Sequence, residues 1–234
     1  RFWALSSRGL LVESDERLRD YQRPYARPDS EVEGWQRDDE GRIGLAEVVR
    51  RVHPTILIGT SGQAASFTEE VVREMAASCE RPVILPMSNP TSLSEAVPAD
   101  LLAWTDGRAL VATGSPFDPV VDHDGKTFSI AQANNALVFP GIGLGAILAR
   151  ARRVTKAMLR AGADAVASEI DSRGAGAALL PDVATLRQTS AAVAAAVWRT
   201  AVEDGVARVA PGSNVEGEVR RSMWEPAYRP IRAV

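Results

Sequence analysis

Short apolar runs alternate with segments of helical periodicity along the first half of the chain. Each run is almost wholly apolar, as in strands that are buried on both faces of a parallel sheet. We predict strands at residues 1–5, 56–59, 83–85 and 109–113. The segments between them have one apolar face, and they predict helices at residues 45–52, 68–79 and 94–104. Strands that recur about every 25 residues, with helices between them, indicate right-handed βαβ units and a parallel sheet.

Residues at the ends of these elements agree with this pattern. Thr68 is a favourable N-cap, and the two glutamates after it lie in the first turn, where the helix dipole favours carboxylates. Pro54 ends one helix and Pro82 starts the next strand. Residues 13–42 are rich in charge and proline, so they predict a long irregular surface segment. Because the chain opens directly on a strand, we expect a chain cut inside a domain.

From Pro140 onward the pattern is helical almost throughout. Helices are expected at residues 141–153, 156–170 and 183–205. The stretch 191–197 is small and apolar on most sides, which suits a helix that lies between two layers. From residue 211 the chain is expected to form an extended tail.

Composition excludes several classes of function. A net charge of −3 over 234 residues leaves no basic surface for nucleic acid. No apolar run reaches the ~20 residues of a membrane span. The single cysteine, Cys79, excludes an internal disulfide and suits a reducing cytoplasm, where we expect the protein to reside. Cys79 is expected to be a packed residue rather than a reactive thiol. His123 is expected in a turn rather than a metal site, because no second nitrogen ligand is near in sequence.

Two asparagine-bearing segments stand where α/β proteins place their chemistry. Asn89 lies in a Met-Ser-Asn-Pro-Thr segment that follows a predicted strand, and Asn134 and Asn135 precede the long helical region. Ligands of open α/β sheets bind at the carboxyl ends of the strands, and asparagine offers a donor and an acceptor without charge. A turn and a helix cap are common uses of these residues, and spacing alone favours that interpretation. The binding interpretation stays open at this point.

Four ordered motifs carry a resemblance to a known family. They lie at residues 56–63, 81–91, 112–117 and 133–141. Together they resemble the cofactor-binding half of malic enzymes, above all the bacterial NAD-linked decarboxylating malate dehydrogenases and the related malolactic enzymes. The resemblance covers about residues 1–205. It implies an α/β fold with a Rossmann-like, doubly wound parallel sheet that lacks its first strand, followed by a mostly helical C-terminal segment. The implied organisation is a partial NAD-binding domain at 1–140, helices packing on it at 141–210, and a tail at 211–234.

The resemblance also implies the residues of a binding site. Substrate contacts are implied for Asn89, Asn134 and Asn135. Contacts with the cofactor are implied for Asn89 and Asn134 and for a further group of small and hydroxyl-bearing residues: Ser6, Ser7, Thr60, Ser61 and Gly62. The implied reaction is the oxidation of L-malate, followed by decarboxylation to pyruvate with the aid of Mg²⁺ or Mn²⁺.

Parts of the family's active site are missing from this sequence. No glycine-rich phosphate loop occurs, and neither the acid and base, a tyrosine and a lysine, nor the acidic metal ligands are present. We expect all of these upstream of Arg1, so no catalytic or metal-binding residue is expected in this chain and the chain alone should be inactive. The glycine-rich string at 141–145 does not follow a strand, and it is interpreted as a site of close helix packing.

The choice of cofactor and of reaction stays open. Ser6 stands where an acidic residue usually binds the adenosine ribose, and with Arg8 it could admit the 2′-phosphate of NADP. Gln22 stands where NADP-linked relatives tend to carry lysine, so NAD is favoured. A malic enzyme that forms a homodimer or homotetramer is the leading hypothesis. A malolactic enzyme and a non-catalytic nucleotide-binding module are the alternatives.

Overall fold

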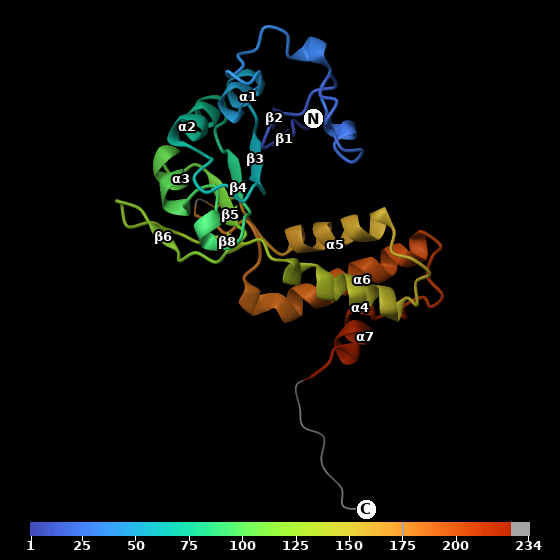
Figure 1. Cartoon of the computed structure of the whole chain (residues 1–234). Helices are drawn as coiled ribbons and strands as arrows, with labels where there is room; N and C mark the ends of the chain where they lie inside the picture. Colours follow the sequence, from blue (N-terminus) through green and yellow to red (C-terminus); the bar gives the residue numbers. More distant parts are fainter. Residues whose placement is uncertain (175, 226–234) are drawn as a thin grey trace, which may run out of the picture. The chain divides into compact units, whose positions relative to one another are not determined.

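The structure is a computed structural model that describes residues 1–174 and 176–225. The chain forms two compact units (Figure 1). The first comprises Arg1–Ala133 and Ser172–Leu179, and the second comprises Asn134–Asp171 and the chain from Leu180 onward. The division predicted from the sequence, at residues 140 and 210, stays a prediction.

A four-stranded parallel sheet forms the centre of the first unit. Its strands follow one another in the order β3 (Ile56–Gly59), β4 (Val83–Pro86), β5 (Leu110–Thr113) and β8 (Ala131–Gln132). Every neighbouring pair is parallel. Three of the predicted strands therefore form one sheet, and the predicted α/β architecture is confirmed.

Helices α1 (Leu45–Val52), α2 (Glu69–Ser78) and α3 (Pro98–Trp104) cover one face of this sheet (Figure 1). Leu57, Ile84 and Val111, one from each of three strands, are buried in the core that these helices share with the sheet. The Thr68 hydroxyl caps α2 by accepting a hydrogen bond from the Val71 amide at 3.4 Å. The apolar spacing and the cap therefore act as the sequence predicts.

The helix predicted at residues 94–104 is shorter than expected. It begins at Pro98, because the Ser94 and Glu95 carbonyls accept hydrogen bonds from the Ala65 and Phe67 amides instead of starting a helix. Proline fits the first turn of a helix, where its missing N–H is not needed. Residues Thr91–Leu93 form a short 3-10 turn. Glu95 therefore lies in a connecting segment, with its side chain fully buried.

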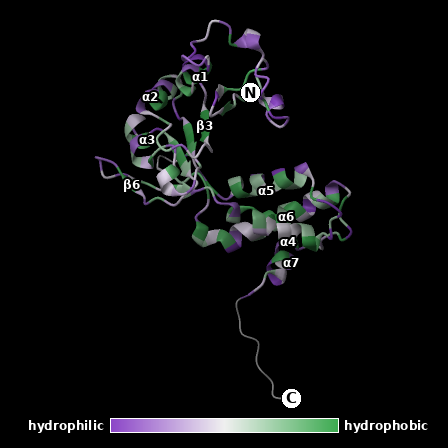
Figure 2. Ribbon diagram, in the orientation of Figure 1, coloured by the Kyte–Doolittle hydropathy of each residue, from purple (hydrophilic) through white to green (hydrophobic). Residues whose placement is uncertain are grey.

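Strand β3 is buried on one face only, although the sequence predicted a strand buried on both. Leu57 is buried under the helices, whereas Ile56 and Ile58 are 55% and 57% exposed. Successive side chains of a strand point to opposite faces of the sheet, so the two isoleucines share the face away from α1–α3. Figure 2 shows this part of the sheet as hydrophobic. The sheet therefore presents apolar side chains to solvent at its β3 edge.

The strand predicted at residues 1–5 does not join the parallel sheet. The structure has a short strand β1 (Leu5–Ser6) that pairs in antiparallel fashion with β2 (Gly9–Leu10). The chain can reverse its direction between β1 and β2 because Gly9 adopts a φ of +84°, which glycine tolerates. The strand is therefore shorter than the predicted one, and its backbone is satisfied by the neighbouring segment rather than by the parallel sheet.

The segment predicted as irregular, 13–42, contains two 3-10 turns, η1 (Arg23–Tyr25) and η2 (Asp29–Glu31), and an isolated β-bridge from Arg27 to Val12. It is anchored by stacking of the Trp3 and Trp35 rings, whose centroids are 5.3 Å apart. The guanidinium of Arg27 lies 4.8 Å from the centre of the Trp3 ring, a cation–π contact. The irregular path is thus held by a few aromatic contacts.

His123 lies in a turn, as predicted. Strands β6 (Val120–Val121) and β7 (Thr127–Phe128) form an antiparallel hairpin. The Asp122 carboxylate accepts hydrogen bonds from the amides of Asp124 and Lys126 across the tip. The part of the chain that the structure describes contains no group of three or more His, Cys, Asp or Glu residues that could hold a metal ion.

The second unit is helical. After the 3-10 turn η4 (Asn135–Leu137), its elements are α4 (Phe139–Leu148), α5 (Lys156–Ser168), η5 (Val183–Thr185), α6 (Leu186–Glu203) and α7 (Val215–Ser222). Helix α6 packs against both α4 and α5, with Val193, Ala194 and Val197 fully buried. The central helix predicted from the small apolar stretch is therefore confirmed, and so is the mostly helical C-terminal segment.

Two of the three glycines in the string at 141–145 allow α4 to approach α6 closely. A Cβ atom on Gly141 would lie 2.5 Å from the Cβ of Val193, and one on Gly145 would lie 2.6 Å from the Ala194 carbonyl oxygen. Nothing lies within 4 Å of a Cβ built on Gly143. The helix-packing interpretation is confirmed for Gly141 and Gly145.

The predicted extended tail contains a helix. Helix α7 begins after Asn214, whose side chain accepts a hydrogen bond from the Gly217 amide at 2.8 Å. Val215 and Val219 are buried in the core of the second unit, and their burial stabilises this helix. Residues 226–234 lie outside the described residues. Among the described helices, none is long and apolar enough to cross a membrane.

Candidate functional site

Three loops follow the strands of the first unit at their carboxyl ends. Residues 60–62 follow β3, residues 87–89 follow β4 and residues 114–115 follow β5. Parallel strands end at the same edge of a sheet, so the three loops are neighbours. Four of the predicted site residues, Thr60, Ser61, Gly62 and Asn89, belong to these loops and are exposed.

The buried carboxylate of Glu95 joins the first two loops. Its Oε1 accepts three hydrogen bonds: from the Ser61 amide at 2.7 Å, from the Ser61 hydroxyl at 2.8 Å and from the Ser88 hydroxyl at 2.5 Å. Its Oε2 accepts a longer bond from the Ser88 amide, at 3.3 Å. The Ser88 oxygen in turn accepts a hydrogen bond from the Gly62 amide at 2.9 Å. The two loops are therefore held through one side chain.

The Glu95 carboxylate stays ionised in this environment. Burial raises its pKa, but the hydrogen bonds from Ser88 and Ser61 outweigh burial and leave the pKa below its ordinary value. Hydrogen bonds donated to the charged form of a carboxylate favour that form. Glu95 therefore acts as an acceptor for all its partners.

Asn89 is oriented by the third loop. The Ser115 hydroxyl donates a hydrogen bond to the Asn89 Oδ1 at 2.6 Å, and Ser115 is itself buried. The Gln132 side chain, at the end of β8, donates to the Gly114 carbonyl at 3.0 Å. Asn89 is exposed and its Oδ1 is engaged by Ser115, so its Nδ2 remains the group of this side chain that can donate hydrogen bonds.

Two glycines permit the close approach of these loops. A Cβ atom on Gly114 would lie 2.0 Å from the Met87 carbonyl oxygen, so no other residue fits there without movement of the backbone. Gly62 is different: its φ is +65° and nothing lies within 4 Å of a Cβ built on it. Its open surroundings leave room for a ligand along the loop that follows β3.

Ser6 ends strand β1 and Ser7 lies in the β1–β2 turn of the first unit. The Ser6 hydroxyl oxygen accepts a hydrogen bond from the Arg8 amide at 3.2 Å, and Ser7 is exposed. The Arg8 guanidinium donates to the Arg17 carbonyl at 3.2 Å and lies 3.5 Å from the Asp15 carboxylate. The Nη2 atom of Arg8 is therefore engaged by its neighbours, whereas its buried Nε has no hydrogen-bond partner among the described residues.

Asn134 and Asn135 belong to the second unit. The Asn134 side chain accepts a hydrogen bond from the Ala136 amide at 2.9 Å and caps η4, which is the structural role that the sequence left open for it. Both residues are exposed. Their predicted roles at the substrate stay predictions.

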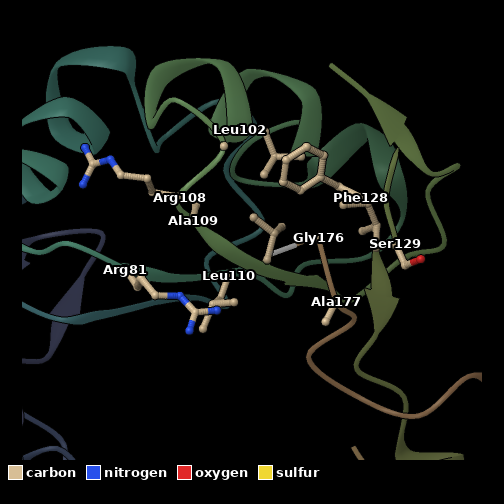
Figure 3. A pocket seen from close by; sticks show the side chains of 12 residues that line it. Arg81, Leu102, Arg108, Ala109, Leu110, Phe128, Ser129, Gly176 and Ala177 are labelled. Atoms are coloured by element: carbon tan, nitrogen blue, oxygen red, sulfur yellow. The ribbon is translucent and has the colours of Figure 1, made fainter. Parts of the chain in front are cut away.

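A small cavity at the other end of the strands is no part of this site. It lies where β5 begins and is lined by Arg81, Leu102, Arg108, Phe128 and Gly176, among others (Figure 3). Its volume of about 20 Å³ is room for one water molecule. The Arg108 guanidinium donates to the Ala76 carbonyl at the end of α2. We interpret this cavity as a packing feature.

Sequence reasoning missed Glu95, Ser88 and Ser115 as parts of the site. Ser88 and Ser115 lie inside the recognised motifs, and their position beside Asn89 or after β5 was the available signal. No such signal in the sequence pointed to Glu95, because a lone glutamate in a segment predicted as helical is ordinarily a solvated residue. Its partner Ser61 is 34 positions away in the sequence.

Comparisons with known proteins identify the family of this chain. The profile of the family described as "Malic enzyme, NAD binding domain" matches residues 1–202. The chain belongs to this family. Its α/β fold is therefore that of a Rossmann-like NAD-binding domain, as the resemblance implied.

Curated relatives agree with this membership. The NAD-dependent malic enzyme 3 of Bacillus subtilis is 52% identical over 235 residues, which cover 100% of this chain and 41% of the relative. The NAD-dependent malic enzyme of Sodalis glossinidius is 47% identical, over 96% of this chain and 40% of the relative. The chain thus spans about two fifths of the length of these malic enzymes.

Solved structures show the same fold. The malic enzyme of Pyrococcus horikoshii superimposes with a TM-score of 0.59 at 26% identity, over 76% of this chain and 36% of that one. The malic enzyme of Entamoeba histolytica gives a TM-score of 0.65 at 24% identity, over 92% of this chain and 42% of that one. The second similarity is informative about the fold alone.

Proposed function

We propose that this chain is the NAD-binding part of an enzyme that oxidises L-malate and decarboxylates the product, so that malate and NAD⁺ give pyruvate, CO₂ and NADH. The observation that carries the proposal is the set of hydrogen-bonded loops at the carboxyl ends of β3, β4 and β5, in a chain of the malic enzyme family. Relatives at 52% and 47% identity bear the name NAD-dependent malic enzyme.

In this proposal the exposed loops bind and orient the reactants. Thr60, Ser61 and Gly62 line the cofactor, with open space beside Gly62 for close approach of its backbone. Asn89 donates its Nδ2 protons to an oxygen of the substrate or of the nicotinamide ribose. For Asn134 and Asn135, which belong to the second unit, we retain polar contact with the substrate as the proposed role. None of these groups removes a proton, so they act by positioning.

The adenosine end of the cofactor is assigned to Ser6 and Ser7. A serine hydroxyl can hydrogen-bond the ribose of NAD without the charge of the acidic residue that is usual at this position. Arg8 is engaged by Arg17 and Asp15, which argues against its use for the 2′-phosphate of NADP. NAD is therefore the proposed cofactor.

Catalytic acid–base groups and the ligands of Mg²⁺ or Mn²⁺ are assigned to the part of the relatives' length that this chain does not span. A bound divalent cation would supply Lewis-acid stabilisation of the developing enolate. The residues described here would contribute binding and orientation only. We further propose that the enzyme is cytoplasmic, in keeping with its single cysteine, and that it forms a homodimer or homotetramer.

The test uses the complete natural protein that contains this chain, with malate, Mn²⁺ and either NAD or NADP. NADH formation together with pyruvate as product is the expected result. Lactate as the product without net NADH would indicate a malolactic enzyme instead. No binding of either nucleotide and no turnover of malate would leave a non-catalytic module and refute the proposal.

The 234-residue chain tested alone is expected to show no malate oxidation. General acid–base catalysis and metal assistance each contribute orders of magnitude in rate, and the chain is expected to lack both. Turnover of the isolated chain near the ~10 s⁻¹ of an ordinary enzyme would contradict the assignment of catalytic groups elsewhere.

A further inference from the structure

We propose that Glu95 is the positioning residue of this site, whose buried carboxylate holds the loops after β3 and β4 in the arrangement that binds NAD. The inference rests on the function proposed above. Nothing in the sequence motifs points to this residue, and its importance follows from its place in the fold.

The geometry of the carboxylate is the first argument. Glu95 has no exposed surface, and its Oε1 receives hydrogen bonds from two residues on two different strand-end loops, Ser61 and Ser88. One side chain thereby fixes the separation of loops that precede and follow α2 in the sequence. Strand pairing alone does not fix the separation of these loops, because the paired residues of β3 and β4 end at Gly59 and Pro86.

The direction of the hydrogen bonds is the second argument. An ionised carboxylate only accepts, so the hydroxyls of Ser61 and Ser88 must both donate to it. The Ser88 oxygen then has its lone pairs free, and it accepts the Gly62 amide at 2.9 Å. Glu95 therefore sets the orientation of the Ser88 hydroxyl and, through it, the position of Gly62. Gly62 is the residue whose open surroundings leave room for the cofactor.

The close fit around Glu95 is the third argument. A Cβ atom on Gly59, the last residue of β3, would lie 2.6 Å from both Cγ and Cδ of Glu95. The side chain thus occupies the space directly against the strand end, which leaves it little freedom to move. A buried charge is costly unless all its hydrogen bonds are made, and here they are made by the loops of the proposed site.

The experiment compares three substitutions in the complete natural protein with a matched control. Glu95→Ala removes the acceptor, Glu95→Gln keeps one acceptor oxygen, and Ser88→Ala removes only the hydroxyl between Glu95 and Gly62. The control is Glu47→Gln. Glu47 is also a buried carboxylate of the first unit, but it accepts from the Gln36 amide and from Arg51 on α1, away from the loops.

Affinity for NAD, the KM for NAD, kcat at saturating NAD and the melting temperature are measured for each protein. We expect Glu95→Ala and Ser88→Ala to raise the KM and the dissociation constant for NAD about tenfold, with a smaller rise for Glu95→Gln. We expect kcat at saturating NAD to change much less. The Glu47→Gln protein should lose melting temperature and keep the wild-type KM.

Two failures can be told apart. Wild-type protein that binds no NAD overturns the proposed function. Wild-type binding with unchanged NAD affinity in the Glu95→Gln and Ser88→Ala proteins overturns the positioning role alone, even if the Glu95→Ala protein does not fold. A loss of melting temperature in these variants without a change in affinity would show that Glu95 serves stability only.

Discussion

The Oδ1 atom of Asn89 accepts a hydrogen bond from the Ser115 hydroxyl, and in the proposed function its Nδ2 donates to the reactants. We predict that Asn89→Ala lowers kcat/KM for malate by about tenfold to a hundredfold in the complete protein, because losing a hydrogen bond to a bound polar group costs about 1–3 kcal/mol. Asn135→Ala should have an effect of the same kind. Steady-state kinetics with a melting curve for each variant is the measurement.

Asn214 provides a matched control for that experiment. It is also an exposed asparagine, but its side chain caps α7 by accepting a hydrogen bond from the Gly217 amide. Loss of such a cap costs about 0.5–2 kcal/mol of stability. Asn214→Ala should therefore lower the melting temperature and leave kcat/KM unchanged. Wild-type kcat/KM in both the Asn89 and Asn135 variants would contradict their role at the substrate.

Glu95 should also make the stability of the protein sensitive to acid. Its pKa is below the ordinary value of 4.5 in the folded state. Its contribution is therefore complete above about pH 4.5 and is lost as the pH falls through the lowered pKa. We predict that the difference in unfolding free energy between wild type and Glu95→Gln narrows over this acidic range. Denaturant unfolding at several pH values measures this difference in free energy. A difference that stays constant with pH would contradict the prediction.

Helices α4 and α6 approach each other where glycine removes the side chain. We predict that Gly145→Ala destabilises the protein by about 1–3 kcal/mol, because a Cβ there would lie 2.6 Å from the Ala194 carbonyl oxygen and the helices would have to separate. Gly143→Ala, two positions away on the same helix, meets no neighbour and should stabilise the helix by roughly 0.5–1 kcal/mol. Thermal melting of the two variants measures both changes in stability. Equal changes for Gly145→Ala and Gly143→Ala would contradict the packing argument.

The β3 edge of the sheet governs how the chain behaves in isolation. Ile56 and Ile58 are more than half exposed, and β3 has a strand partner on one side only among the described residues. An exposed apolar edge strand is a template for association with another chain. We predict that the 234-residue chain alone self-associates, and that the double substitution Ile56→Lys and Ile58→Lys reduces this association.

Sedimentation or light scattering at several concentrations gives the measurement. Val121→Lys is the matched control, because Val121 is 63% exposed but lies in the β6–β7 hairpin, away from the sheet edge. It should leave association unchanged. A wild-type chain that is monomeric at all concentrations tested would show that the edge is not adhesive.

Much of the fold could be predicted from short stretches of sequence. The apolar runs of β3 and β4 form strands of one parallel sheet, and the helix spacing of residues 45–52, the Thr68 cap and the small residues of α6 act as expected. Each of these signals depends on residues within about one or two turns of each other, because periodicity and capping are local effects. The motifs around Asn89 also located the edge of the sheet where the site is proposed.

Other features depend on contacts between residues that are distant in the sequence. The one-sided burial of β3 depends on which face of the sheet the helices cover. The role of Glu95 arises only when two parallel strands bring Ser61 and Ser88 to the same carboxylate. Periodicity and capping therefore predict most of the elements, and the motifs carry the resemblance to the family. The burial of a charge among distant donors, by contrast, is a property of the assembled loops, because the free energy of a buried group is set by the neighbours that folding brings to it.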